Sequence, residues 1–493
     1  MVLSPIERKD SRRKLFALAV IVAAQFMVVL DIAIVNVALP AIKGDLHFAE
    51  ANLQWVISAY AILFGGALLL GGRLADIFGR RRMFMVGLAL FSLSSLLCGL
   101  SWSEASLIGF RALQGLGGAL LAPAALSILM TTFAEGAARN RALGIWGAAS
   151  GSGGAAGVLL GGVLTSYLSW QWVFFINVPV GIAVIAAAPF VLIESRGGHG
   201  HRHFDVAGAI TVTSGVMLLV YAMTRAAEDG WMSIATVSLL GASAALIGAF
   251  VAIERRSPAP LLPMRIFRSR TLSAANAIAV VIGAIAFAEF FLLTLYMQQV
   301  LGYSAIQTGV AFAAITFTIV VFANVAQTLV TRFGVRVVLA TGLGLDALAL
   351  ALFTQLPVHG HYFWNMFPAF LISGVGLAFS FVPVTIAGLA GVDRADAGIA
   401  SGLINTTRQV GGAVGLAAVT TIVAASTTTG SGLSVAEVDS GLTNGFQVGF
   451  VVLAGLALVG AVIAATLLAP QPREHAAVEV LTNDNITTLE EAA

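Results

Sequence analysis

The sequence predicts an all-α membrane protein built from two six-helix bundles plus two extra helices. The prediction rests on the composition, on a series of apolar runs long enough to span a bilayer, and on a repeated loop segment. Of the 493 residues, 58% are hydrophobic and 10% are charged, whereas an average soluble domain has roughly 25% charged residues. The mean hydropathy is +0.94. So much apolar surface must face lipid rather than water, and the net charge of +2 gives no indication of a nucleic-acid partner.

The apolar runs predict 14 transmembrane helices, since a spanning helix needs about 20 mostly apolar residues. A basic stretch precedes the first run, as in a secretory signal. That run is longer than a signal core, however, and similar runs follow it, so we interpret it as a retained span. The expected spans begin near Leu15, Leu53, Met83, Ser106, Leu143, Trp172, Val206, Ile234, Leu272, Ile306, Val337, Phe363, Ala397 and Gln447.

The positions of Lys and Arg predict the orientation of these spans. With the N-terminus inside, most of these residues fall in cytoplasmic segments. The outer loops then hold only Lys43 and Arg225, and the spans hold Arg111 and Arg408. Cytoplasmic loops of membrane proteins carry an excess of Lys and Arg, and one missed span would invert everything after it. We therefore expect both termini to be cytoplasmic.

An internal repeat relates the two halves of the chain. The stretch LADIFGRRRMFMVGLAL at 74–90 and the stretch LVTRFGVRVVLATGLGL at 329–345 share Leu, Phe, Gly and Arg residues at a constant offset. A weaker echo relates QGLGGA, starting at 114, to SGVGLA, starting at 373. Transporter folds often arise by internal duplication. Both long stretches follow the second span of a six-span unit if spans seven and eight are an insertion.

The expected organisation follows from these boundaries. It comprises a cytoplasmic tail (1–14), an N-terminal six-helix bundle (15–193), a cytoplasmic linker with an inserted helix pair (194–271), a C-terminal six-helix bundle (272–469) and a disordered cytoplasmic tail (470–493). The linker contains His199, His201 and His203. These could suggest a metal site, but a flexible Gly-rich connector is the plainer interpretation. We expect no metal and no other cofactor.

Asp31 is the only charged residue between Lys14 and Lys43, inside the first span. Ionisable groups within spans are costly and are functional candidates by default. Arg111, in the fourth span, is expected at a comparable depth, so the two could pair. Burial favours a protonated carboxyl, whereas a nearby arginine favours a charged one. Such a balance suits a group that gains and loses a proton in each transport cycle. A static pair that fixes two helices is the alternative.

The second half carries two further candidates, Glu289 in span nine and Asp346 in span eleven. Either could titrate or attract a cationic substrate at the midplane, whereas Asp346 could instead serve a helix contact. Asn36 and Asn324 are weaker candidates for substrate binding. Arg408 could anchor span thirteen by extending its charged head to water.

The segment GGRLADIFGRRR at 71–82 closely resembles the loop signature of the major facilitator superfamily. Gly72 would let helices approach, and Gly79 would permit a tight turn. Asp76 and the arginines would form a charge cluster that pairs with the opposite bundle when the cytoplasmic side closes. These gating candidates are Gly72, Asp76, Gly79, Arg80, Arg81 and Arg82.

Further segments resemble signatures of the same superfamily. RALQGLGGA at 111–119 is similar to the fourth-helix signature, whose arginine is associated with proton transfer. AAGVLLGG at 155–162 is similar to the fifth-helix signature of exporters, with Gly157, Gly161 and Gly162 on a close-packing face and Val158 where that signature carries proline. LDIAIVNVALP at 30–40, WQWVFFINVPVG at 170–181 and SGLINTTRQVGGAVG at 401–415 resemble the fourteen-span drug:proton antiporter branch.

This resemblance implies the major facilitator fold and a proton-coupled secondary active transporter in the plasma membrane. It would export hydrophobic or cationic drugs by alternating access and so confer antibiotic resistance. The alternative is a dedicated exporter of one native metabolite, antibiotic, lipid or peptide on the same fold. An enzyme is not expected, because no catalytic dyad or His-Glu-x-x-His motif occurs. The expected partners are protons, small substrates and the lipid bilayer, and we expect a monomer.

Overall fold

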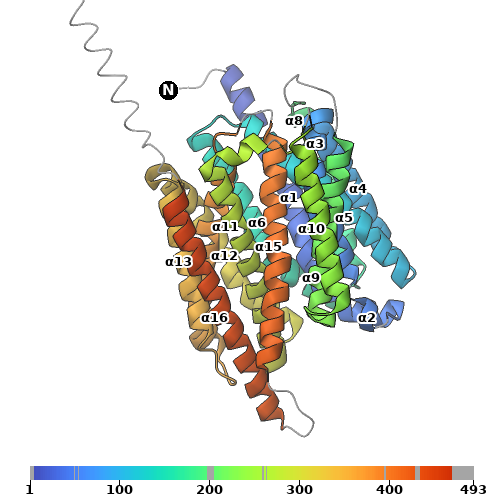
Figure 1. Cartoon of the computed structure of the whole chain (residues 1–493), viewed down its shortest axis with the longest axis vertical. Coiled ribbons are helices and arrows are strands. Elements are labelled where there is room, and N and C mark those ends of the chain that lie inside the picture. Colours follow the sequence, from blue (N-terminus) through green and yellow to red (C-terminus); the bar gives the residue numbers. More distant parts are fainter. Residues whose placement is uncertain are drawn as a thin grey trace, which may run out of the picture.

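The computed structural model is a bundle of long, nearly parallel helices (Figure 1). It describes residues 5–48, 50–53, 55–196, 205–257, 260–262, 264–392, 396–427 and 434–468. The N-terminal bundle consists of α1 (Pro5–Leu46), α3 (Trp55–Phe78), α4 (Arg80–Gly99), α5 (Glu104–Thr132), α6 (Ala137–Tyr167) and α8 (Asn177–Val191), with the short α2 (Glu50–Leu53) and α7 (Trp172–Phe175). The C-terminal bundle consists of α11 (Arg270–Leu295), α12 (Ala305–Phe333), α13 (Val335–Phe353), α14 (Phe367–Leu389), α15 (Ala397–Ser426) and α16 (Val435–Leu467). The inserted pair is α9 (Val206–Asp229) and α10 (Ile234–Glu254), and three short helices complete the fold: η1 (Met264–Arg268), η2 (Tyr296–Val300) and η3 (Tyr362–Met366).

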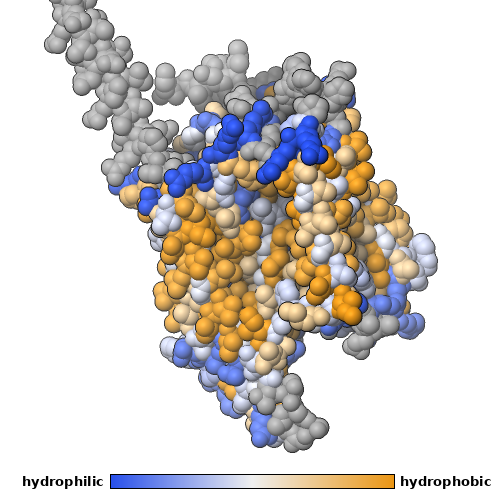
Figure 2. All heavy atoms as spheres, in the orientation of Figure 1, coloured by the Kyte–Doolittle hydropathy of each residue, from blue (hydrophilic) through white to orange (hydrophobic). Residues whose placement is uncertain are grey.

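The all-α membrane fold is confirmed. Within the described residues, 13 helices are long and apolar enough to span a membrane, and the number rises to 14 if the two segments of α6 count as one span. Those segments meet at an angle of 40° between Gly154 and Ala156. The bend lies in a run of Gly and Ser, which is a common cause of helix kinks, so α6 bends without a proline at Val158. Figure 2 shows a hydrophobic belt around the visible face, with hydrophilic residues at both ends.

The helix of the last expected span begins well before its predicted start. The sequence placed the start of the last span near Gln447, but α16 begins at Val435. Ser434 and Glu437 form a capping box, in which each side chain accepts a hydrogen bond from the other residue's backbone N–H. This cap starts the helix in a polar segment that hydropathy alone excludes from the span.

The repeat detected in the sequence corresponds to a repeat in the structure. Gly79 ends α3 and Gly334 ends α12, and both have positive φ, of 109° and 82°. An L-residue with a side chain rarely adopts this conformation, so glycine ends the helix at both positions. The turns that follow lead into α4 and α13.

The weaker sequence similarity, between the segments that start at 114 and 373, also corresponds to matching helix contacts. A Cβ on Gly115 of α5 would lie 2.4 Å from the carbonyl oxygen of Tyr60 on α3, and a Cβ on Gly374 of α14 would lie 2.9 Å from that of Ile315 on α12. Helices α5 and α14 therefore pack on their neighbours through corresponding glycines. By this correspondence Gln114 matches Ser373.

The inserted pair lies alongside both bundles (Figure 1). Val212 and Val216 of α9 share a buried cluster with Leu69 of α3 and with Ile399 and Leu403 of α15. The pair therefore spans the junction between α3 and α15 rather than extending either bundle.

Candidate functional site

Asp31 and Arg111 form an ion pair in the core of the N-terminal bundle. Nη1 of Arg111 lies 2.6 Å from Oδ2 of Asp31, and the two side chains are 1% and 0% exposed. Helix α1 supplies the aspartate and α5 supplies the arginine, as the two depths in the sequence suggested. The structure therefore brings this predicted pair together, away from water and from lipid.

Two amide side chains extend this ion pair to a network of four residues, and two further groups contact Arg111. Nε2 of Gln114 and Nδ2 of Asn177 each donate to Oδ1 of Asp31 at 2.8 Å. Arg111 also donates through Nε to the Val56 carbonyl at 2.9 Å, and its guanidinium lies 4.4 Å from the centre of the Tyr60 ring. Both carboxylate oxygens thus have charge-assisted or amide donors, which is the condition under which a buried ion pair is tolerated.

The sequence predicts a role for Asp31 and Arg111 but gives no indication of one for Gln114 or Asn177. Both amides lie inside segments that resemble signatures of transporters, RALQGLGGA and WQWVFFINVPVG. The signal that could have found them is the same as for the ion pair, a polar side chain within an apolar span. Neutral amides are common enough in spans that this signal is weak.

Glu289 and Asp346 lie in the core of the C-terminal bundle, each 1% exposed. Oγ of Ser373 donates to Oε1 of Glu289 at 2.5 Å, and Oγ of Ser380 donates to Oδ2 of Asp346 at 3.1 Å. Both serines belong to α14. The surrounding helices enclose the two carboxyls, so in this conformation neither is presented to a substrate.

The other two predicted substrate residues lie outside this core. Asn36 and Asn324 are exposed, and the Asn36 amide donates to the Ile32 carbonyl of its own helix. Arg408 does not extend to water at a helix end as expected. Its guanidinium lies 5.5 Å from the centre of the Phe381 ring and donates to the Asn405 side chain at 2.8 Å. Arg408 therefore lies among neutral partners within the membrane-spanning part of α15.

Asp76 joins the two bundles. Its carboxylate accepts hydrogen bonds from the backbone N–H groups of Gly398 and Ile399, both at 3.2 Å, in the first turn of α15. Arg80 donates to the same carboxylate at 2.9 Å. A carboxylate at a helix N-terminus satisfies free N–H groups and interacts favourably with the helix dipole. Asp76 of α3 thus caps a helix of the opposite bundle.

Glycines allow this contact. A Cβ on Gly72 would lie 2.3 Å from the Gly398 carbonyl oxygen, so α3 and α15 meet backbone to backbone. The contact lies at the arginine-rich end of the molecule, which we define by Arg80, Arg81, Arg82, Arg139, Arg265, Arg332 and Arg336. The two bundles are therefore closed against each other at this end.

Arg81 and Arg82 differ from Asp76, because their partner belongs to their own bundle. Glu194, just after α8, accepts hydrogen bonds from the backbone N–H groups of both arginines at 3.1 and 3.2 Å. A Cβ on Gly79 would lie 2.6 Å from this carboxylate, and the positive φ of 109° disfavours any residue with a side chain at this position. These three residues shape the turn, and the inter-bundle contact depends on Gly72 and Asp76.

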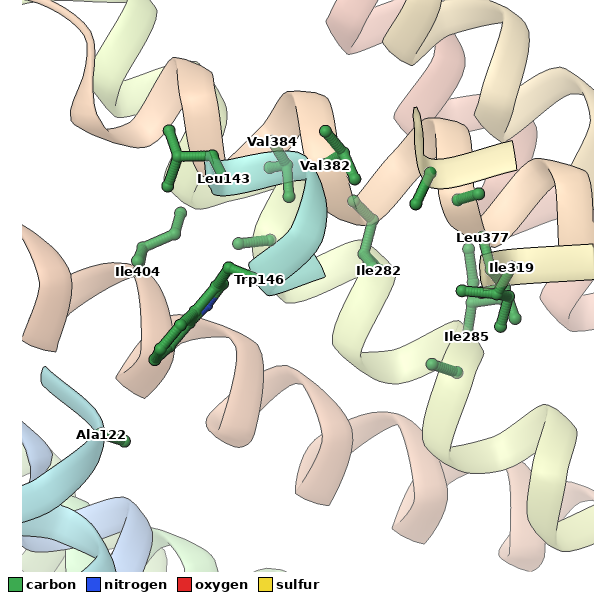
Figure 3. Packing of buried hydrophobic residues seen from close by; sticks show 14 of the residues in the cluster. Ala122, Leu143, Trp146, Ile282, Ile285, Ile319, Leu377, Val382, Val384 and Ile404 are labelled. Atoms are coloured by element: carbon green, nitrogen blue, oxygen red, sulfur yellow. The ribbon is translucent and has the colours of Figure 1, made fainter. Parts of the chain in front are cut away.

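The predicted glycines of α6 face two neighbours. A Cβ on Gly157 would lie 2.7 Å from the Leu30 carbonyl oxygen and one on Gly161 would lie 2.8 Å from that of Ile34, so both pack on α1. Gly162 instead faces Ile306 of α12. Leu143 and Trp146, nearer the start of α6, lie beside Val382 of α14 and Ile404 of α15 in the buried region between the bundles (Figure 3). Helix α6 thus contacts both bundles.

No group of three His, Cys, Asp or Glu side chains placed to hold a metal ion occurs among the residues that the structure describes. His199, His201 and His203 lie outside those residues, as does the C-terminal tail.

Comparisons with known proteins add family evidence to this geometry. The sequence profile of the Major Facilitator Superfamily matches residues 21–416. The chain is 44% identical over 423 residues to the cephamycin export protein CmcT of Amycolatopsis lactamdurans, covering 85% of each chain. It is 37% identical over 462 residues to the puromycin resistance protein pur8 of Streptomyces alboniger, covering 92% of each. The human organic anion transporter MFSD10 has a similar fold, with a TM-score of 0.62, 16% identity, and coverage of 94% of this chain and 100% of that one.

Proposed function

Because the chain belongs to the major facilitator superfamily and is a multi-pass protein of the plasma membrane, we propose that it exports antibiotic-type compounds in exchange for protons. The observation that carries this proposal is the pairing of two features in one molecule. The bundles close against each other at one end through Asp76 and α15, and each bundle holds ionisable groups buried between its helices.

The contact at Asp76 supports transport by alternating access. Two helix ends that meet through N–H groups, one carboxylate and close glycines form a contact that a rigid-body movement of the bundles can break and re-form. We assign the arginine-rich end to the cytoplasm, since cytoplasmic loops are rich in Arg. In this assignment the described conformation is closed towards the cytoplasm, and both termini are cytoplasmic.

Asp31 and Arg111 are the proposed coupling pair. Protonation of Asp31 would remove the charge that holds Arg111 and would turn one carboxylate oxygen from an acceptor into a donor. The four-residue network could not keep its present hydrogen bonds, so helices α1, α5 and α8 would be free to rearrange. Proton entry would in this way favour a different conformation of the N-terminal bundle.

The names of the relatives support an antibiotic as substrate. Besides cephamycin and puromycin, they include a tetracenomycin C resistance and export protein of Streptomyces glaucescens, 36% identical over 392 residues and covering 79% of this chain and 72% of that one. Each of these names contains a single compound. This favours a dedicated antibiotic exporter over a broad drug exporter, although both use the same fold. We expect the protein to act as a monomer.

Uptake into inverted membrane vesicles tests the exchange. We expect an imposed pH gradient, acidic inside, to drive uptake of at least one of cephamycin, puromycin and tetracenomycin C. Collapse of the gradient with a protonophore should stop it, and an Asp31→Asn variant should lose it. Uptake that continues without the gradient would refute the coupling.

The range of substrates is measured with the same vesicles and a panel of unrelated toxic cations. A dedicated exporter should transport few of them, whereas a broad exporter should transport most. The panel thus separates the two candidate functions without further assumptions.

A further inference from the structure

One face of α14 holds two buried carboxyl groups of the C-terminal bundle. Ser373, Gly376 and Ser380 are three, four and seven positions apart, so they lie along the same side of the helix. Ser373 binds Glu289 of α11, and Ser380 binds Asp346 of α13. The Asp346 carboxyl lies directly against Gly376, where no side chain could fit. Helix α14 thus joins the two acids through two hydroxyl groups.

Each of these carboxyls has an unused oxygen. Oε2 of Glu289 and Oδ1 of Asp346 have no hydrogen-bond partner and are inaccessible to solvent. A charged carboxylate normally accepts several hydrogen bonds or pairs with a cation when it is buried. One serine hydroxyl per carboxyl does not meet this requirement, whereas a neutral acid needs far less stabilisation.

In the described part of the second bundle, no cation corresponds to the one that holds Asp31. The correspondence that relates Gln114 to Ser373 relates Arg111 to Phe370. The Phe370 ring stacks on Phe312 at 5.7 Å and meets Phe353 edge to face, also at 5.7 Å. An aromatic cluster therefore occupies the place where the first bundle has a guanidinium.

Among the residues that the structure describes, no other cation compensates for the missing arginine. The charged and titratable side chains on the elements packed against α11 and α13 are Arg332 of α12, Arg408 of α15, Glu437 and Asp439 of α16, Tyr296 of η2, Tyr362 of η3, and Arg265 and Arg268 of η1. The two tyrosine hydroxyls donate to the carbonyls of Pro357 and Ala311, and Arg408 donates to Asn405. Within the described part of the chain, none of these groups forms an ion pair with Glu289 or Asp346.

We propose that Glu289 and Asp346 form a second proton-binding site, with both carboxyls protonated in the conformation closed at the arginine-rich end. Each acid keeps its proton on the carboxyl group while Ser373 or Ser380 donates to it. When α14 moves relative to α11 and α13, water reaches Glu289, which releases its proton to that water and becomes charged. This role rests on the proposed proton exchange and adds a second titrating site to it.

Infrared spectroscopy of the purified full-length protein tests the protonation directly. A protonated carboxyl has a C=O stretching band that carboxylates and amides lack, and the band shifts in D₂O. At neutral pH, we expect the difference spectrum of wild type minus Glu289→Gln to show this band, and wild type minus Asp346→Asn to show a second one. Glu437→Gln, which alters an exposed acid of α16, is the matched control and should remove only a carboxylate band. A carboxylate band in place of the acid band for either residue would overturn the proposal.

Transport separates this proposal from the proposed function. In vesicles, we expect Glu289→Gln to lose gradient-driven uptake of whichever of the three antibiotics the wild type transports, while that compound still binds. Acid bands together with gradient-independent wild-type uptake would refute proton exchange but leave the protonated acids in place. Oxygen-lined carboxyl pairs can also bind Na⁺. Loss of the acid bands on adding Na⁺, with uptake driven by a Na⁺ gradient, would therefore replace the proton by Na⁺ and overturn the proposal.

Discussion

The N-terminal and C-terminal bundles pack their helices in corresponding ways, yet they stabilise their buried carboxyls differently. In the first, Asp31 has a guanidinium at 2.6 Å and two amide donors at 2.8 Å. In the second, Glu289 has one serine hydroxyl. The matching glycine contacts at Gly115 and Gly374 show that the helix packing is shared. The fold thus fixes where α5 and α14 approach their neighbours, while single residues on those helices decide whether a buried acid has a counter-ion.

The two corresponding contacts between the bundles also differ in charge, and again the N-terminal half has the charged group. Asp76 of α3 caps α15 with two backbone hydrogen bonds and a salt bridge to Arg80. The repeat relates Asp76 to Thr331 of α12, which meets Asn140 at the start of α6 through one hydrogen bond of 3.4 Å. The buried acid with a counter-ion and the charged contact between the bundles thus both belong to the N-terminal half. We infer that the two halves contribute unequally to the transport cycle.

The largest expected loss of stability follows from replacing Asp31, the buried carboxyl of the N-terminal bundle. Asp31→Asn leaves Arg111 buried without its counter-ion, and breaking a buried pair in this way costs about 3–5 kcal/mol. We expect a clearly lower unfolding temperature in detergent, measured by intrinsic fluorescence. Adding Arg111→Leu should recover part of the loss, because no uncompensated charge remains. A single variant as stable as the wild type would contradict a charged pair.

The next effect concerns the amide and hydroxyl donors. Gln114→Ala removes a donor to a charged carboxylate, worth about 1.5–3 kcal/mol, whereas Ser373→Ala removes a donor to a neutral acid, worth about 0.5–1.5 kcal/mol. Unfolding measurements on both variants check this order. Equal losses, or a larger loss at Ser373, would indicate that Glu289 is charged.

The contact between the bundles is expected to weaken by about 0.5–2 kcal/mol in Asp76→Ala, because this variant loses the two hydrogen bonds that cap α15. Opening can be followed as faster alkylation of Ser401→Cys, which is fully buried near the start of α15, in a Cys98→Ser background. Thr331→Ala, in the corresponding contact, is the matched control with a smaller expected effect. Equal alkylation rates in the two variants would argue against unequal contacts.

The smallest effect is expected at Glu289. Glu289→Gln keeps an acceptor for the Ser373 hydroxyl and changes no charge if the acid is protonated, so the stability should change by less than about 1 kcal/mol. The same acid-to-amide replacement that destabilises the first bundle should therefore be tolerated in the second. A loss as large as that of Asp31→Asn would remove the distinction between the bundles.

Much of the fold could be predicted because it depends on patterns that one sequence contains. The spans follow from apolar length, and the bundles follow from the repeat around Gly79 and Gly334. The Asp31–Arg111 pair was predictable because two rare charges fall at similar depths. The start of α16 was not, since the cap formed by Ser434 and Glu437 extends the helix into polar sequence.

The residues that bind the two buried acids of the C-terminal bundle could not be predicted in the same way. Glu289 and Asp346 are as conspicuous as Asp31, but their serine partners are indistinguishable in sequence from other serines in spans. The capping of α15 by Asp76 depends on which helix end lies opposite, a long-range relation that sequence periodicity does not contain. Arg408 likewise has neutral partners where a charge at a helix end suggested water.

Proton counting on substrate binding tests the central claim most directly. Puromycin is added to lightly buffered, detergent-solubilised protein, and the released protons are measured with a pH-sensitive dye for the wild type, Glu289→Gln and Asp31→Asn. If puromycin is a substrate in the vesicle assay, we expect puromycin binding to release protons from the wild type and fewer protons from each variant. A wild type that binds puromycin without releasing protons at any pH between mildly acidic and mildly basic would contradict it.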